Sequence, residues 1–281
     1  MKKKALLKDT LREIRKSFGR FFSIFAIVGI GVAFFAGVRD SVPVMKNTAD
    51  TYFDDYNFMD LKIMSTIGMT KEDVSAIRQV DGVAGVYGSY SMDVLNTHNN
   101  QQRVYKLLSY PMNAKAEDEN YINQMRLIKG RLPQKADECV IEYTNIKGAD
   151  SRIGETITFA SGTDEKLDAS LKRSTYKIVG EVTMPYYLSY EKGSSAIGSG
   201  SIDNYAVIPD TNFKSSYYTE VYVTVDGAKK PNSYADAYFD IIDPKKTTIT
   251  ALGEERAQER FDDIKKEALA KVEAGRKEYE K

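Results

Sequence analysis

The chain has 281 residues, and its 40 Lys and Arg residues balance its 40 Asp and Glu residues, so the formal net charge is zero. This balance gives no overall attraction to nucleic acid, and we expect no nucleic-acid partner. The length allows one large domain or two small ones, and the single cysteine, Cys139, excludes an intrachain disulfide.

Residues 1–20 are predicted to form a basic amphipathic helix on the cytoplasmic side of a membrane. Leu7, Leu11, Ile14 and Phe18 are spaced 4, 3 and 4 residues apart, which makes one apolar helical face. Basic side chains lie mostly off that face and could contact either anionic membrane lipids or a cytoplasmic protein. The basic residues that we assign to this lipid or docking face are Lys8, Arg12, Arg15 and Lys16.

Residues 21–38 form an unbroken apolar run without a charge, and they predict a transmembrane helix. At about 1.5 Å per residue, such a helix roughly matches a 30 Å hydrocarbon layer. A buried core helix is disfavoured, because helices of soluble proteins rarely run this long without a polar face. A cleaved signal peptide would have a shorter apolar run and a small-residue cleavage site. An uncleaved anchor in the cell membrane is therefore favoured, with the basic N-terminus cytoplasmic and the bulk of the chain extracytoplasmic.

Three small residues in this run, Gly29, Ala33 and Gly37, recur every fourth position. They fall on one stripe of a helix, where another helix backbone can approach closely. The spacing predicts a packing seam for other transmembrane helices. The alternative is the ordinary frequency of glycine in membrane helices.

Residues 40–252 are predicted to form an extracytoplasmic α+β domain. A strand from Leu61, a helix after Thr70 and a strand from Val83 make a βαβ-type opening. Short strands separated by turns follow over residues 120–205 and indicate a small β-rich insert. Val221–Val225 reads as a strand, and residues 233–242 and 247–252 as a helix and a further strand. We therefore expect a split α/β domain with halves near residues 55–120 and 205–252.

Nothing in this stretch indicates catalysis. Cys139 lies in a strand pattern typical of a buried thiol, and His98, the only histidine, lies in a turn composition. The glycine-rich residues 193–201 lack a phosphate-loop pattern. Adjacent carboxylates, such as those at positions 54 and 55, point apart on a helix or strand. We assign no catalytic, cofactor-binding or metal-binding residue and expect neither a cofactor nor an enzyme.

Residues 253–281 are predicted to begin a stalk or coiled coil. An apolar stripe with spacings of 4, 3, 4 and 4 runs through a segment rich in charge, and it consists of Ala257, Phe261, Ile264, Ala268 and Val272. A solvated single helix is the alternative. The pattern has neither a cap nor a closing glycine, which is typical of a truncated end.

The order of these elements resembles the first part of an FtsX-like, MacB-type ABC transporter permease. The strings that carry the resemblance are LLKDTLREI at 6–14, DGVAGV at 81–86, KGRLP at 129–133, ECVI at 138–141, IGETI at 153–157 and IVG at 178–180. The terminal helix resembles the extracellular coiled coil of Gram-positive members. Such permeases have at least four membrane spans, whereas this sequence has one apolar run long enough to cross a bilayer.

The resemblance implies an N-terminal fragment of a permease subunit, whose extracytoplasmic domain is coupled mechanically to a separate cytoplasmic ABC ATPase. The remaining permease portion and membrane lipids would be its other partners. The alternative is a single-span, membrane-anchored extracellular binding module that transports nothing. Co-purification with an ATPase would distinguish the two.

Overall fold

The computed structural model describes residues 2–112, 114–144 and 151–279, which divide into two compact units at Thr51. The first unit is helical. Helix α1 (Lys2–Lys16) is followed, after Ser17, by helix α2 (Phe18–Asp55). Helix α2 therefore continues for 17 residues beyond Val38, the last residue of the predicted span. It is the one helix in the described part of the chain that is long and apolar enough to cross a membrane.

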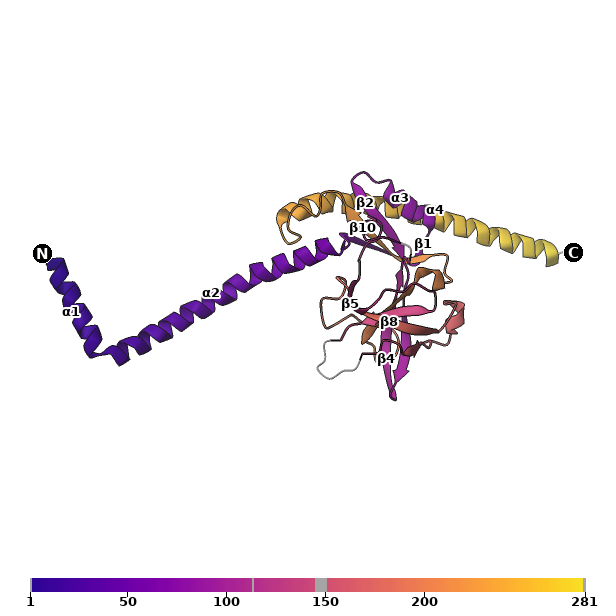
Figure 1. Cartoon of the computed structure of the whole chain (residues 1–281). Helices are drawn as coiled ribbons and strands as arrows, with labels where there is room; N and C mark the ends of the chain where they lie inside the picture. The colour runs from indigo at the N-terminus through magenta and orange to yellow at the C-terminus, as the bar shows by residue number, and fades with distance from the viewer. Residues whose placement is uncertain (1, 113, 145–150, 280–281) are drawn as a thin grey trace. The chain divides into compact units, whose positions relative to one another are not determined.

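The second unit, residues 52–281, contains two lobes (Figure 1). The smaller lobe is a three-stranded antiparallel sheet of order β1-β10-β2, with the strands β1 (Leu61–Met69), β2 (Val83–Ser89) and β10 (Tyr218–Val225). Helix α3 (Lys71–Arg78) connects β1 to β2 and begins at a capping box between Thr70 and Asp73. The predicted βαβ opening is confirmed as a split motif, because β10 lies between its two strands.

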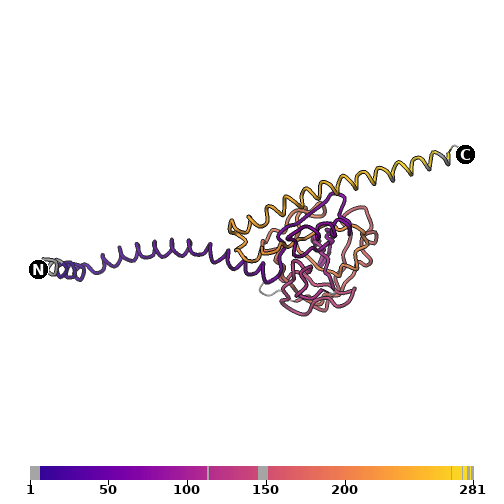
Figure 2. The backbone as a smooth tube through the Cα atoms, turned by 90° about the horizontal axis from the view of Figure 1, so that it is seen from above, coloured from indigo at the N-terminus to yellow at the C-terminus, as the bar shows by residue number. Residues whose placement is uncertain are grey.

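Helix α4 (Asp236–Tyr279) covers this sheet together with α3. Ile242 and Ile249 are buried against strand residues such as Val223 and Val225. Figure 2 shows the first part of α4 alongside the domain. Arg256 holds it there through an ion pair with Asp73 at 2.9 Å.

The prediction of a strand over residues 247–252 is wrong, because α4 runs through them. Three threonines made this segment look like a strand, since β-branched residues favour sheets. In the helix their hydroxyls donate to the carbonyl oxygens four residues earlier, at 2.8–3.1 Å. Burial of Ile249 on the smaller sheet outweighs the local preference.

The larger lobe is a seven-stranded mixed sheet whose main path is β3-β4-β9-β6-β8-β5, with β7 paired to β8. Short 3-10 turns at Leu167–Ala169 and Asp210–Asn212 precede β8 and follow β9. The strands are β3 (Ser91–His98), β4 (Gln101–Tyr110), β5 (Arg126–Gly130), β6 (Glu138–Glu142), β7 (Thr156–Thr158), β8 (Thr175–Thr183) and β9 (Asn204–Pro209).

Both faces of this sheet are covered by apolar clusters. Leu107, Cys139 and Ile178 lie in the cluster on one face, and Val140 and Val182 lie in the other. Cys139 is fully buried, as its strand pattern predicts, and burial raises the pKa of its thiol to about 12. The thiol is therefore neutral at physiological pH and contributes to packing.

The boundaries between the two lobes differ from the boundaries that we predicted between the α/β halves and the β-rich insert. The predicted α/β half over 55–120 includes β3 and β4, yet both strands belong to the larger sheet, as does β9 at the start of the other half. The hairpin of β3 and β4 turns through Asn99 and Asn100, both with positive φ. Parallel pairing of β4 with β9 then extends the larger sheet across the predicted boundary.

One ion pair stabilises the loop between β5 and β6, in two of the strings that carry the family resemblance. Arg131 donates to the nearly buried carboxylate of Glu138 at 2.7 Å, and the backbone N–H of Gln134 donates to the same carboxylate at 2.8 Å. These bonds lower the pKa of Glu138 to about 2, and the bond from Arg131 has the largest effect. Next to this loop, Gly130 and Gly180 pair so closely that a Cβ on Gly180 would lie 2.4 Å from a carbonyl oxygen.

Glu138→Gln should lower the free energy of unfolding by about 1–3 kcal/mol at pH 7, because charge-assisted hydrogen bonds to a buried carboxylate are lost. A carboxyl whose pKa is lowered on folding stabilises the native state above its ordinary value of 4.5 and loses this contribution as the pH falls towards 2. The deficit of the variant should therefore shrink between these values. Urea unfolding followed by circular dichroism would measure it.

Glu259→Gln is the matched control, since that glutamate pairs with an arginine but is about half exposed. It should change the unfolding free energy by less than about 0.5 kcal/mol. A deficit of Glu138→Gln that is the same at pH 7 and pH 3 would show that this ion pair does not stabilise the loop.

Candidate functional site

Residues 52–60, which we call the junction, connect α2 to the rest of the second unit. Helix α2 ends there in a Schellman motif. The N–H of Phe58 donates to the carbonyl of Phe53 at 2.9 Å, and that of Asn57 to the carbonyl of Asp54 at 3.3 Å. The rings of Phe53 and Phe58 stack with their centroids 4.7 Å apart. Asn57 takes the left-handed conformation that the motif requires, with φ 47°.

The junction is hydrogen-bonded to the larger lobe through the segment that leads into β5. The side-chain amide of Asn57 donates to the carbonyl of Tyr121 at 3.0 Å, and its own carbonyl accepts from the N–H of Asn123 at 2.9 Å. The side chain of Asn123 in turn accepts from the N–H of Met59 at 3.1 Å. Asn57 and Asn123, both with positive φ, therefore each bond through the side chain to the backbone next to the other, and this joins the two chain segments.

The junction is bonded equally to the smaller lobe through Asp60. Its carboxylate accepts from the N–H of Val225 at 2.7 Å and from the hydroxyl of Tyr238 in α4 at 2.8 Å. Its own N–H donates to the carbonyl of Val223 at 2.9 Å. Burial raises the pKa of Asp60, while the two hydrogen bonds oppose that rise. The end of α2 thus contacts both lobes and the first turn of α4 within a few residues.

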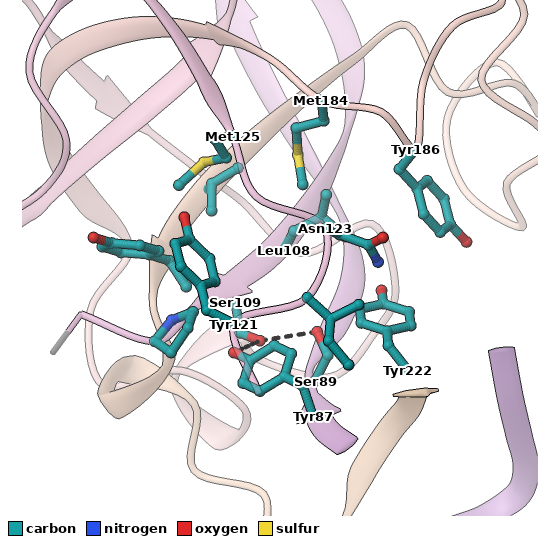
Figure 3. Close-up of a pocket in the computed structure, with 14 residues that line it drawn as sticks. Tyr87, Ser89, Leu108, Ser109, Tyr121, Asn123, Met125, Met184, Tyr186 and Tyr222 are labelled. Carbon is teal, nitrogen blue, oxygen red and sulfur yellow. Dashed lines mark hydrogen bonds between the residues drawn. The ribbon is translucent and has the colours of Figure 1, made fainter. Parts of the chain in front are cut away.

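The two lobes meet around a small aromatic cavity of about 20 Å³ (Figure 3). Tyr87 and Ser89 of β2 lie on one side, and both hydroxyls are within hydrogen-bond distance, 3.2 and 3.0 Å, of the hydroxyl of Ser109 in β4. Met125 and Met184 lie at the opposite end of the view. A space of this size holds about one water molecule and excludes larger ligands. The cavity is therefore part of the seam between the lobes.

A buried charge lies close to the same seam. The carboxylate of Glu220 in β10 forms an ion pair with Lys62 at 2.9 Å and accepts from the hydroxyls of Ser91 and Tyr222 at 3.0 and 2.5 Å. Lys62 also donates to the hydroxyl of Tyr186, beyond the end of β8. Ser91 begins β3, so this network joins the smaller sheet to the larger one. Fully paired polar groups of this kind specify one relative placement of the packed elements.

The residues that the sequence singled out lie in the first unit. Gly29, Ala33 and Gly37 are on exposed turns of α2, and nothing lies within 4 Å of the position that a Cβ would take on either glycine. Lys8, Arg12, Arg15 and Lys16 are exposed on α1. Both the packing seam and the docking face stay predictions. Among the described residues, no group of three or more metal-ligating side chains occurs.

Sequence reasoning missed the junction. Its signal is the string FDDYNF at 53–58, in which an asparagine follows the last helical turn and two phenylalanines stand five residues apart. That spacing is typical of a Schellman motif with its accompanying apolar contact. The partners at Asn123 and Tyr238 have no comparable signal, because only the fold brings them to residue 57 or 60.

Asn57→Ala should lower the free energy of unfolding by about 2–3 kcal/mol, because alanine disfavours the left-handed conformation and the partly buried hydrogen bond from the side chain to the carbonyl of Tyr121 is lost. Asn57→Gly should cost less, since glycine adopts this φ freely. Asn100→Ala is the control. Asn100 also has a positive φ, 59°, but lies at an exposed turn, so this variant measures the cost of the left-handed backbone without the junction's hydrogen bonds. Equal losses in Asn57→Ala and Asn100→Ala would show that the side-chain bonds of the junction contribute nothing.

Comparison with known proteins identifies the family. A model of the MacB-like periplasmic core domain matches residues 21–238. A comparison with curated proteins gives no match. The extracellular domain of the noncanonic ABC-type transporter YknZ from Gram-positive bacteria is similar at 14% identity, covering 59% of this chain and 78% of that one, with a TM-score of 0.35.

The periplasmic region of MacB from Actinobacillus actinomycetemcomitans is similar at 12% identity, covering 67% of this chain and 76% of that one, with a TM-score of 0.34. Likeness at this level carries no functional detail. The family model, in contrast, covers more than half of the chain. The chain therefore belongs to the family of the MacB-like periplasmic core domain.

Proposed function

We propose that this chain is a permease subunit of an ABC transporter, in which the extracytoplasmic domain is coupled mechanically to a separate cytoplasmic ATPase. The observation that carries this proposal is the extent of the family match. It begins at residue 21, in the apolar part of α2, and ends at residue 238, at the tyrosine that bonds to Asp60. The match thus includes the apolar helix, the junction and the strands of both lobes.

The charge distribution supports the orientation that this role requires. Eight basic residues precede Phe21 against two acidic ones, whereas five aspartates and two basic residues lie between positions 39 and 60. The positive-inside rule then places α1 in the cytoplasm and the lobes outside. The chain has no phosphate-loop pattern. Nucleotide hydrolysis would therefore be the work of a partner subunit beneath the membrane.

The path of coupling follows from the helices and the junction. A cytoplasmic ATPase would bind the basic face of α1, which is separated from α2 only by Ser17. The carbonyl of Ser17 accepts from the N–H of Phe21 at 3.0 Å, so the helical bonding passes through this position. Displacement of α2 would reach both lobes and α4 together, because the junction is bonded to all three. Gly29, Ala33 and Gly37 would face the other spans of the permease.

Replacing Arg12, Arg15 and Lys16 together by glutamate should reduce the amount of ABC ATPase that co-purifies with the chain by about tenfold, because like charges across an interface are strongly unfavourable. Quantitative mass spectrometry of the purified complex measures this amount. The matched control reverses Lys166, Lys172 and Arg173, which are exposed on the larger lobe. It should leave the ATPase at the level of the wild-type chain.

Thermal unfolding of the domain should be unchanged in both triple variants, since every replaced side chain is exposed. If the ATPase co-purifies fully with the α1 variant, α1 is not the docking element. If photocrosslinkers along residues 8–20 capture lipid and never an ATPase, the chain is better described as a membrane-anchored binding module.

A further inference from the structure

A polar cleft of about 290 Å³ crosses one face of the larger sheet. The residues that line the cleft pair with one another on neighbouring strands. On β4, Arg103 pairs with Asn96 of β3 and Tyr105 pairs with Asn204 of β9. Glu181 of β8 pairs with Lys129 of β5. The cleft therefore draws side chains from strands at both edges and in the centre. The covered face of a sheet ordinarily carries apolar residues, so a polar hollow there needs an explanation.

The carboxylates of the cleft are already neutralised. Glu142 forms an ion pair with the buried Lys192 at 3.1 Å and accepts from the amide of Asn204 at 3.3 Å. Glu181 accepts from the hydroxyl of Ser151 at 2.6 Å, with the ammonium of Lys129 at 3.7 Å. Neither acid is left to attract a cation.

The arginines of the cleft keep unused donors. Arg103 is exposed, bonds to the amide oxygen of Gln101 at 3.3 Å, and has no carboxylate within 4 Å among the described side chains. Arg152 uses its Nε atom for Glu155 at 2.9 Å, while another nitrogen lies 3.5 Å from His98. A guanidinium has five N–H donors in a planar fork that suits a carboxylate. Arg152 is thus paired with Glu155 but keeps free N–H groups, and the charge of Arg103 is not balanced by a carboxylate of the described residues.

The cleft also holds an acceptor without a donor. The side-chain oxygen Oδ1 of Asn204 is buried and has no hydrogen-bond partner among the described residues. Donation from the amide nitrogen to Glu142 fixes the orientation of this side chain. A buried polar atom that lacks a partner is costly. It is satisfied when a bound molecule supplies an N–H.

We propose that this cleft binds a small carboxylate that carries an adjacent N–H, which is the chemistry of the free carboxy-terminal residue of a peptide. The carboxylate bonds to Arg103 and Arg152, and the N–H donates to Asn204. Ile141 and the ring of Tyr105, both nearly buried, give an apolar floor for one small side chain. A phosphate dianion fits less well, because it carries a second negative charge, whereas Arg103 is the guanidinium of the cleft that no carboxylate of the described residues pairs with. This site is independent of the proposed ATPase coupling.

Isothermal titration of the full chain in detergent with N-acetyl-dialanine tests the proposal. The free acid should bind, and its carboxy-terminal amide should bind about tenfold more weakly, since the charge-assisted bonds are lost. Arg103→Gln should weaken binding of the acid by about tenfold and leave that of the amide unchanged. Arg173→Gln, which removes the same charge from an exposed position outside the cleft lining, should have no effect.

Arg103 is exposed, so the variant should fold, and thermal unfolding checks this. Equal binding of acid and amide, no binding of the acid at about 10 mM, or equal losses in Arg103→Gln and Arg173→Gln would each overturn the proposal. Binding of inorganic phosphate in place of the peptide acid would show an anion site without the N–H contact and would overturn the peptide assignment.

Discussion

The reciprocal bonds of Asn57 and Asn123 hold the end of α2 to the larger lobe, and the placement of the junction depends on this pair. Each asparagine has positive φ, and each offers its side chain to the backbone beside the other, at 3.0 and 3.1 Å. Three residues later, Asp60 bonds to β10 and to α4. The residue at which α2 ends therefore sets which backbone groups Asn57 and Asp60 reach.

This arrangement has a consequence for movement. The lobes are joined to each other by the Glu220 network and by the serine and tyrosine hydroxyls around the small cavity. They are joined separately to the junction. Relative sliding of the lobes would leave the buried polar groups of these networks without partners. The two lobes, the junction and the first half of α4 should therefore respond to α2 as one body.

The sequence predicted the types of most elements but not their grouping. The apolar run of α2, the capping box of Thr70 and the alternation around Cys139 are local signals, and the helix and strands that they predict are confirmed. The partition of strands between lobes depends on pairing between distant segments, as in the parallel pairing of β4 with β9. Local patterns do not contain this information. The helix over residues 247–252 was missed for the same reason, since burial on β10 and its neighbours decides it.

The candidate sites show the same division. The basic face of α1 and the small residues of α2 can be listed from periodicity alone, because a helix fixes their relative placement. The junction and the polar cleft each combine residues from several strands and loops. Arg103 and Asn204, for example, are 101 positions apart in the chain but lie on neighbouring strands. Only the fold shows that the guanidinium of Arg103 and the amide of Asn204 line the same cleft.

Native-state hydrogen exchange, followed residue by residue at increasing urea, tests most directly whether the domain is one body. Amides of Val221 and Val223 report on the smaller lobe, and those of Val140 and Val182 on the larger, all being buried. We predict that the slowest amides of both lobes open with the same free energy, within about 0.5 kcal/mol, because they exchange through global unfolding. Opening of the smaller lobe at a distinctly lower free energy, with the larger sheet still protected, would contradict it.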